Sequence, residues 1–172
     1  MGLWQLVGFA STSLFGTLLH FLYDWSDKSQ WIAPFSGVNE STFEHMKLLF
    51  WPMLLFTVIE SLFTNNREAF WSIRLEGILV GLSLIPVLFY TYNGVIGKSP
   101  DWINIAIFFL SVALAYLSIY LLERRAPTSY LSPVFALLIL TALTLVFVLF
   151  TFYPPRIALF CDPLTGTFGI SA

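Results

Sequence analysis

Five long apolar runs constrain this chain more than any other feature of its sequence. They cover residues 3–24, 42–64, 70–92, 102–122 and 130–153. An α-helix needs about 20 apolar residues to cross the hydrocarbon core of a bilayer, and each run is long enough. In lipid every backbone polar group must be satisfied within its own segment, so each run is expected to be a helix. The sequence therefore predicts an all-α membrane protein, a bundle of five transmembrane helices.

The composition supports the same class of protein. Hydrophobic residues make up 58% of the 172 residues and charged residues only 10%, and the mean hydropathy is +0.81. A soluble domain carries about 25% charged residues, so we expect the lipid bilayer to surround this chain. A net charge of −2 gives no basic surface for nucleic acid, and we exclude that partner. We expect a single transmembrane domain over residues 1–172, in which residues 154–172 are a tail.

The basic residues that flank the runs bear on orientation. On the side of the N-terminus lie Arg67, Arg124 and Arg125. On the other side lie Lys28, Lys98 and Arg156. These counts are equal, and Arg74 together with the terminal amine favours a cytoplasmic N-terminus and an outer C-terminus.

Polar residues gather on one side of the membrane when five helices run up and down in order. This set includes both histidines of the chain and comprises His20, Asp24, Asn39, Glu40, Glu44, His45, Lys47, Tyr90, Tyr92, Asn93, Asp101, Asn104, Arg156, Cys161 and Asp162. Polar side chains inside lipid are costly and usually face a cavity or the interior of a bundle. The pattern predicts one polar site at the outer boundary of the lipid region.

His20, Asp24, Glu40 and His45 are the candidate metal ligands of this site. A divalent ion such as zinc takes nitrogen and oxygen ligands, and a water on it can attack an ester, amide or phosphate. The candidate catalytic residues are His20, Asp24 and Glu44. Either Glu44 or Asp162 is the candidate general base. A metal-free pair of His20 and Asp24 acting as a base fits the pattern as well, and a bis-histidine haem is a further alternative.

Four residues are candidates for binding a lipid headgroup or another small ligand: Asn39, Glu40, Lys47 and Asp162. Lys47 either extends to the interface, binds an anionic headgroup or pairs with Glu40. The segment "STFE", residues 41–44, is also typical of a capping box, which would make Glu44 structural. Asp162 joins the site only if the tail folds back.

Glu60 and Arg74 lie near the opposite face of the membrane. Each charge alone would be expensive in lipid, so we expect an intramembrane ion pair. A role of Glu60 or Glu76 in proton transfer is the alternative.

Two segments resemble a known family. "VNESTFEHMKLLFWPMLLF" and "PPRIALFCDPLTGTFGI" are similar to a bacterial family of small multi-pass membrane proteins, described as a domain of unknown function. Its helix-opening segment, Asn-Glu-Ser-x-x-Glu-His-x-Lys-Leu followed by a proline, corresponds here to Asn39, Glu40, Ser41, Glu44, His45, Lys47, Leu48 and Pro52. The resemblance implies a polytopic protein of the bacterial cytoplasmic (inner) membrane, and it supplies no activity, substrate or cofactor.

Three functions fit these observations. The first, which we prefer, is a membrane-embedded hydrolase or transferase that acts on a lipid or another interfacial substrate. The second is a small ion or solute carrier or channel subunit, although the missing internal repeat counts against a transporter built from inverted repeats. The third is a structural or partner-binding membrane subunit. The sequence does not fix the oligomeric state.

Overall fold

The computed structural model describes residues 2–64, 69–97, 100–125 and 131–170 of the chain. This part forms α1 (Leu3–Trp25), α2 (Thr42–Phe63), α3 (Phe70–Ile96), α4 (Asp101–Arg124), α5 (Pro133–Phe152) and the short 3₁₀ helix η1 (Ala158–Phe160). The five α-helices are long and apolar enough to cross a membrane. The chain is therefore an all-helical, multi-pass membrane protein, as its apolar runs predict. Arg67, Lys98 and residue 130, used in the sequence analysis, lie outside the described residues.

The ends of the helices differ from the predicted runs by a few residues, for local reasons. α3 continues to Ile96 and stops at Gly97, whose φ of 101° is accessible to glycine. α5 begins at Pro133 because the Ser132 hydroxyl accepts a hydrogen bond from the N–H of Phe135. Proline suits the first turn of a helix, where no backbone donor is needed.

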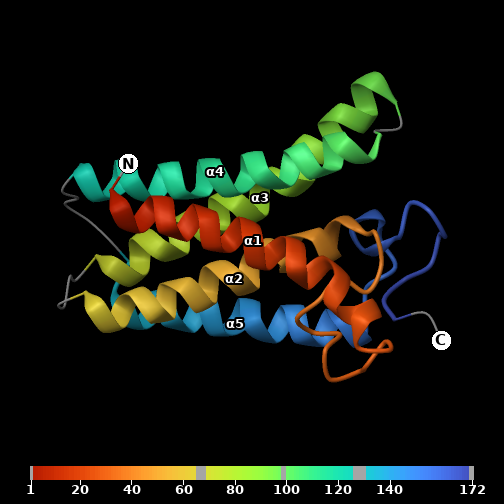
Figure 1. The fold of residues 1–172 in the computed structure, drawn as a ribbon, viewed down its shortest axis with the longest axis horizontal. Helices are drawn as coiled ribbons and strands as arrows, with labels where there is room; N and C mark the ends of the chain where they lie inside the picture. The colour runs from red at the N-terminus through yellow and green to blue at the C-terminus, as the bar shows by residue number, and fades with distance from the viewer. Residues whose placement is uncertain (1, 65–68, 98–99, 126–130, 171–172) are drawn as a thin grey trace.

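The helices lie side by side along the long axis of the molecule (Figure 1), and the two termini lie at opposite ends of the bundle. We call these ends the N-terminal end and the C-terminal end of the bundle. α3 packs against α2, α4 and α5, and α1 packs against α2 and α4. At the C-terminal end, the last turns of α3 and the first turns of α4 lean away from the other helices (Figure 1).

Two glycines of α1 allow this helix to approach its neighbours closely. A Cβ atom at Gly8 would lie 2.3 Å from the ring of Tyr116, and one at Gly16 would lie 2.6 Å from the Leu48 carbonyl oxygen and the Phe108 ring. Small residues let membrane helices come together in this way. His20 is one turn beyond Gly16, so close packing at the glycine directs the imidazole towards the start of α2.

The tail after α5 folds back over the C-terminal end of the bundle. Phe160 of η1 is buried, and its ring lies 4.5 Å from that of Phe43 and 5.4 Å from that of Phe150. An isolated antiparallel bridge between Cys161 and Phe168 closes the segment that follows. The tail therefore becomes part of the wall around the polar residues at this end.

Candidate metal centre

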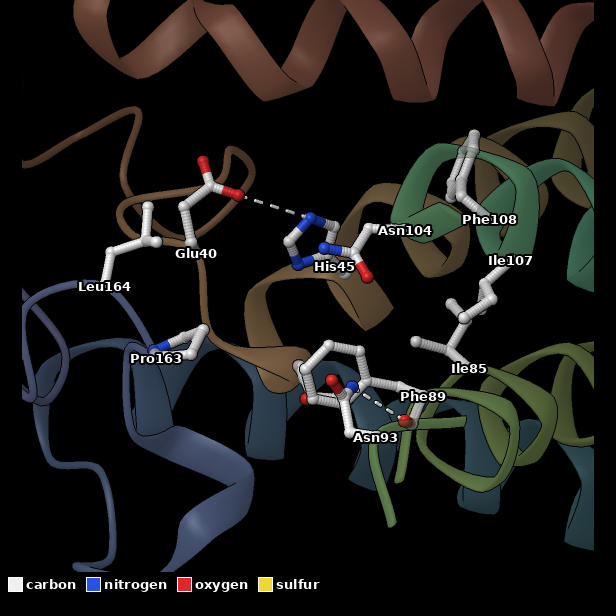
Figure 2. Close-up of a pocket in the computed structure, with 11 residues that line it drawn as sticks. Glu40, His45, Ile85, Phe89, Asn93, Asn104, Ile107, Phe108, Pro163 and Leu164 are labelled. Atoms are coloured by element: carbon white, nitrogen blue, oxygen red, sulfur yellow. Dashed lines mark hydrogen bonds and ion pairs between the residues drawn. The ribbon is translucent and has the colours of Figure 1, made fainter. Parts of the chain in front are cut away.

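His20, Glu40 and His45 come together at the C-terminal end of the bundle. The His20 Nε2 lies 3.7 Å from Oε1 of Glu40, and the His45 Nε2 lies 3.5 Å from Oε2 of the same carboxylate. The centroids of the two imidazole rings are 5.7 Å apart. One possible ligand atom from each residue lies within 4.8 Å of the other two. Figure 2 shows the contact between Glu40 and His45 as a dashed line.

These separations suit a shared metal ion better than direct hydrogen bonds. Hydrogen bonds between nitrogen and oxygen usually measure about 2.7–3.2 Å, and both distances here are longer. Two ligands at about 2.1 Å from a tetrahedral zinc ion are about 3.4 Å apart. Each nitrogen–oxygen distance, 3.7 Å from His20 to Oε1 of Glu40 and 3.5 Å from His45 to Oε2, is therefore close to one edge of such a tetrahedron.

The ring of His45 is oriented for ligation by its own helix. Its Nδ1 lies 3.0 Å from the carbonyl oxygen of Ser41. A carbonyl oxygen only accepts hydrogen bonds, so Nδ1 carries the proton and donates it. In the neutral ring Nε2 then has its lone pair free and directed towards Glu40. Metal-binding histidines are commonly fixed in this way by a backbone carbonyl.

Glu40 is positioned by a tight turn before α2. The Oδ1 of Asn39 accepts a hydrogen bond from the Ser41 N–H at 2.9 Å, and its amide donates to the Gly169 carbonyl at 3.0 Å. Asn39 thus links the turn to the folded-back tail. Its contacts stabilise the backbone on both sides of Glu40, whereas the sequence analysis assigned Asn39 to ligand binding.

A cavity of about 390 Å³ lies beside the three side chains. It runs between α1 and α4, and its walls include Gly16, Thr17, Phe21, Ile105 and Phe109. A smaller cavity of about 80 Å³ continues towards α3 (Figure 2). Glu40 and His45 line both cavities. The candidate ligands therefore lie where the two cavities meet.

Asp24 does not belong to this group. Its carboxylate is exposed, and the described residues that can hold one ion together are His20, Glu40 and His45. Asp24 is one turn beyond His20 on the same helix, at the point where α1 ends and the chain turns away. The predicted set of four ligands is therefore corrected to three. His20 lines the larger cavity, whereas Asp24 is not among the residues around either cavity.

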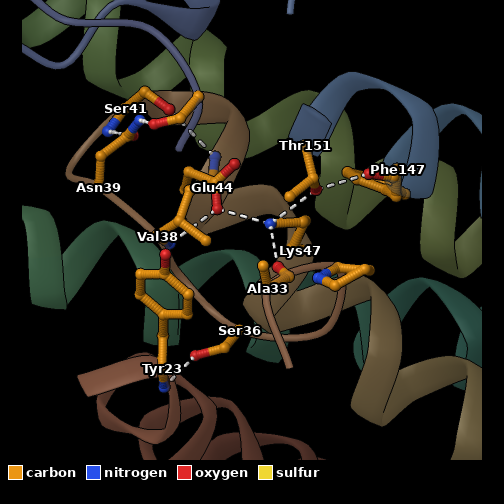
Figure 3. Close-up of polar contacts among 12 residues, drawn as sticks. Tyr23, Ala33, Ser36, Val38, Asn39, Ser41, Glu44, Lys47, Phe147 and Thr151 are labelled. Atoms are coloured by element: carbon orange, nitrogen blue, oxygen red, sulfur yellow. Dashed lines mark hydrogen bonds and ion pairs between the residues drawn. The ribbon is translucent and has the colours of Figure 1, made fainter. Parts of the chain in front are cut away.

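Glu44 and Lys47 form a separate, buried network (Figure 3). The Lys47 ammonium donates to Glu44 at 2.6 Å, to the Ala33 carbonyl at 2.9 Å and to the Thr151 hydroxyl at 2.9 Å. Glu44 also accepts from the Val38 N–H at 2.9 Å. A lysine with three partners inside the protein cannot extend to a headgroup. Its acidic partner is Glu44 rather than Glu40. Lys47 is therefore structural, which corrects its predicted role in binding a headgroup or pairing with Glu40.

The capping box is present in a modified form. The Ser41 hydroxyl accepts from the N–H of Glu44, as expected, but the Glu44 carboxylate binds the N–H of Val38 instead of that of Ser41. Asn39 supplies the acceptor for the Ser41 N–H. Glu44 therefore stabilises the start of α2 and does not face the cavity as a general base.

Asp162 stabilises the tail instead of joining the ligands. Its two carboxylate oxygens accept from the Leu164 N–H and the Thr165 hydroxyl, both at 2.8 Å. This is the hydrogen bonding of an Asx turn. The turn places Leu164 against both cavities, so the tail contributes an apolar wall rather than a carboxylate.

Comparison with known proteins identifies the family of the chain. The sequence model of the family of unknown function DUF6512 matches residues 1–170. The chain belongs to this family. The comparisons with curated proteins and with solved structures gave no match. The family description states no activity, so the function of this DUF6512 protein has to be inferred from the site itself.

A second polar cluster of this DUF6512 protein lies at the N-terminal end of the bundle. Arg74 binds Glu60 through two hydrogen bonds of 2.6 and 2.8 Å, and its Nη2 also lies 2.9 Å from Glu123. Glu123 accepts in turn from the Gln5 amide at 2.6 Å. Glu60 and Arg74 are thus in contact, as their depths predict, and Gln5 and Glu123 are partners that the sequence analysis missed. The up-and-down order of the helices, which places both histidines on one side of the membrane, also places Gln5 and Glu123 together. The first run begins and the fourth run ends on this face of the membrane.

Proposed function

We propose that His20, Glu40 and His45 bind one divalent metal ion, zinc, and that the protein is a membrane-embedded hydrolase of a lipid or another interfacial substrate. The observation that carries this proposal is the convergence of two Nε2 atoms on one carboxylate beside a cavity. Catalytic zinc sites hold the metal with three protein ligands and keep another position open. Two histidines and one glutamate are one of the ligand sets that such sites use.

The chemistry follows from the open position. A zinc ion lowers the pKa of a bound water to about 7, which supplies a hydroxide near neutral pH. This matters here because the other predicted bases are engaged elsewhere: Glu44 in the buried network and Asp162 in the tail turn. Among the described residues that line the two cavities, Glu40 is the only carboxylate. Activation of water would thus depend on the metal rather than on a second acidic side chain.

The same ligand set also suits ferrous iron, which two histidines and one carboxylate hold in many oxygenases. We propose zinc because hydrolysis needs only water as its second reactant. Oxygenation would need dioxygen and an electron donor. The identity of the bound metal separates these two reactions.

We also propose that the protein resides in the bacterial cytoplasmic membrane, with its N-terminus in the cytoplasm. The support is that three of the four described arginines, Arg74, Arg124 and Arg125, lie at the N-terminal end of the bundle. At the C-terminal end the described lysines and arginines are Lys28, Lys47 and Arg156, of which Lys47 is buried in its network with Glu44. The cavity would then open near the outer surface, where headgroups are within reach.

Elemental analysis of purified protein tests the proposal. We expect about one zinc ion per chain in the wild type and loss of that ion in His20→Gln, Glu40→Gln and His45→Gln. Removing a ligand should weaken binding by more than the roughly 10–100-fold seen when a residue that merely orients a ligand is changed.

Asp24→Asn is the matched control, because Asp24 is exposed and one turn from His20 but outside the group. It should retain the metal. A wild-type protein that binds no metal, or ligand variants that bind it as tightly as the wild type, would contradict the proposal. Bound iron in place of zinc would support the site and refute hydrolysis.

A further inference from the structure

We infer that the substrate is an uncharged acyl ester of a small alcohol, and that it reaches the site from the membrane through the gap between α1 and α4. This inference rests on the proposed hydrolase function and names its substrate class. It is carried by the shape, the exposure and the charge of the two cavities.

The mouth of the larger cavity lies between α1 and α4. Phe21 of α1 and Ile105 and Phe109 of α4 line this cavity, and they are 46%, 58% and 38% exposed. Side chains that line a cavity and are also exposed mark its opening. Because both helices cross the membrane at this level, the opening between them is lateral, and an apolar chain could pass through it without crossing water.

The two cavities differ in size on the two sides of the ligands. The larger one, about 390 Å³, falls within the usual range of about 300–1,000 Å³ for small-molecule sites. The smaller one, about 80 Å³, ends against Phe89 and Ile107 and also has Asn93 and Asn104 in its wall. The geometry assigns an acyl chain to the larger cavity and a small alcohol portion, such as glycerol, to the smaller one. The ester bond between them would then lie at His20, Glu40 and His45.

The charge of the lining favours an uncharged substrate. Among the described residues around the two cavities there is no lysine or arginine, and Glu40 is the only charged side chain. Proteins usually recognise phosphate groups with arginine or lysine. Lys47, which lies on the same helix as His45, is enclosed in its own network with Glu44. A phosphate on the alcohol portion would find no basic partner in this part of the site.

The reaction is a balanced hydrolysis. Hydroxide oxygen forms a bond to the carbonyl carbon, and the bond from that carbon to the alkoxy oxygen breaks. The released alkoxide takes up the proton that the water lost. One water and one ester thus give one fatty acid and one alcohol. No oxidant or reductant is involved.

The test uses two tryptophan substitutions on α4. Ile105→Trp would fill the mouth of the larger cavity, whereas Leu110→Trp is a control on the same helix, 47% exposed and outside both cavities.

The protein is reconstituted with zinc in vesicles of an ether-linked phosphocholine lipid, which offers no ester. The added probes are 1-oleoylglycerol and its 3-phosphate. Released oleic acid is measured by mass spectrometry, and zinc content is measured in every variant.

Binding is measured separately from turnover. Native mass spectrometry of the metal-free protein reports retention of 1-O-hexadecylglycerol, an ether analogue that cannot be hydrolysed. We expect hydrolysis of 1-oleoylglycerol to exceed that of the phosphate by at least about tenfold, and Ile105→Trp to lose about tenfold in both hydrolysis and retention of the analogue. Leu110→Trp should stay within about twofold of the wild type.

The outcomes separate the two proposals. If zinc is bound and the ester is cleaved, but the phosphate is preferred or Ile105→Trp behaves like Leu110→Trp, the substrate class is wrong and the hydrolase stands. If retention of the analogue is reduced by Ile105→Trp but no zinc binds, the cavity binds a lipid and the proposed hydrolase function is wrong. If neither the ester nor the analogue is recognised, the inference is overturned.

Discussion

The first turns of α2 divide their polar side chains between two tasks. Glu44 and Lys47 are buried and tie the start of α2 to the α1–α2 loop and to α5. Glu40 and His45 remain half-exposed at the cavity. Sequence spacing alone does not make this division, because it depends on how α2 is rotated against its neighbours. Of the polar residues at the start of α2, Glu44 and Lys47 are therefore structural, and Glu40 and His45 belong to the candidate site.

Lys47→Met should destabilise the protein without weakening the metal site. The substitution leaves the Glu44 carboxylate buried without its cation, which costs about 3–5 kcal/mol in comparable cases. Adding Glu44→Gln removes the stranded charge and should recover a large part of that loss. Thermal unfolding in detergent measures stability, and zinc titration of the folded fraction measures the site. A folded Lys47→Met protein with strongly reduced zinc affinity would show that Lys47 serves the site after all.

Glu60→Gln should destabilise the protein more than the double variant Glu60→Gln with Arg74→Met. The single change leaves the buried guanidinium of Arg74 with Glu123 as its remaining acidic partner. Breaking a buried ion pair in this way lowers the free energy of unfolding by about 3–5 kcal/mol. A double-mutant cycle in detergent gives the coupling energy of the pair. Additive losses would contradict the contact. Glu76→Gln is the control, because Glu76 belongs to the same helix and has none of the hydrogen bonds of this cluster.

At the scale of elements, glycines determine how closely the helices pack. A Cβ atom at Gly77 of α3 would lie 2.3 Å from Ile119 of α4, and one at Gly81 would lie 2.9 Å from Leu49 of α2. These two glycines form the motif "GILVG", whose spacing is common in membrane helices and does not by itself indicate which helices it joins. The structure shows that it faces two different neighbours.

Gly77→Val should destabilise the bundle by about 1–3 kcal/mol, because the added side chain overlaps Ile119. Shortening the neighbour in the double variant Gly77→Val with Ile119→Ala should restore part of the loss. Gly94→Val in the same helix is the control, since a Cβ there meets nothing within 4 Å. Unfolding in detergent measures all three. A loss for Gly94→Val equal to that for Gly77→Val would assign the effect to helix propensity rather than to packing.

At the scale of the whole molecule, five helices place the termini on opposite faces of the membrane. We expect a cysteine added near the N-terminus to be protected from an impermeant thiol reagent in intact cells, and one added near the C-terminus to react. Both are introduced in a Cys161→Ser background, because Cys161 is the only native cysteine. Labelling of both termini from the same side would contradict the helix count. Exchanged labelling would reverse the orientation and leave the fold intact.

The sequence predicted the helices and the meeting of the two histidines for the same reason. Run length and apolarity are local properties, and an odd number of spans then decides which helix ends share a face of the membrane. Whether Asp24 or Glu40 completes the group depends on the turn at Asn39 and on its contact with Gly169, 130 positions away. Such long-range contacts leave no periodic pattern in the sequence. The partners of Lys47 and the turn at Asp162 were missed for that reason.

The most direct test of the account is anomalous scattering at the zinc absorption edge, from crystals of the full chain grown with zinc. We expect one peak at about 2.0–2.2 Å from the Nε2 of His20, the Nε2 of His45 and a carboxylate oxygen of Glu40. A small movement of the two rings would suffice, since the ligand atoms already lie within 4.8 Å of one another. The absence of a peak between these three side chains, or a peak on Asp24 or Asp162 alone, would contradict it.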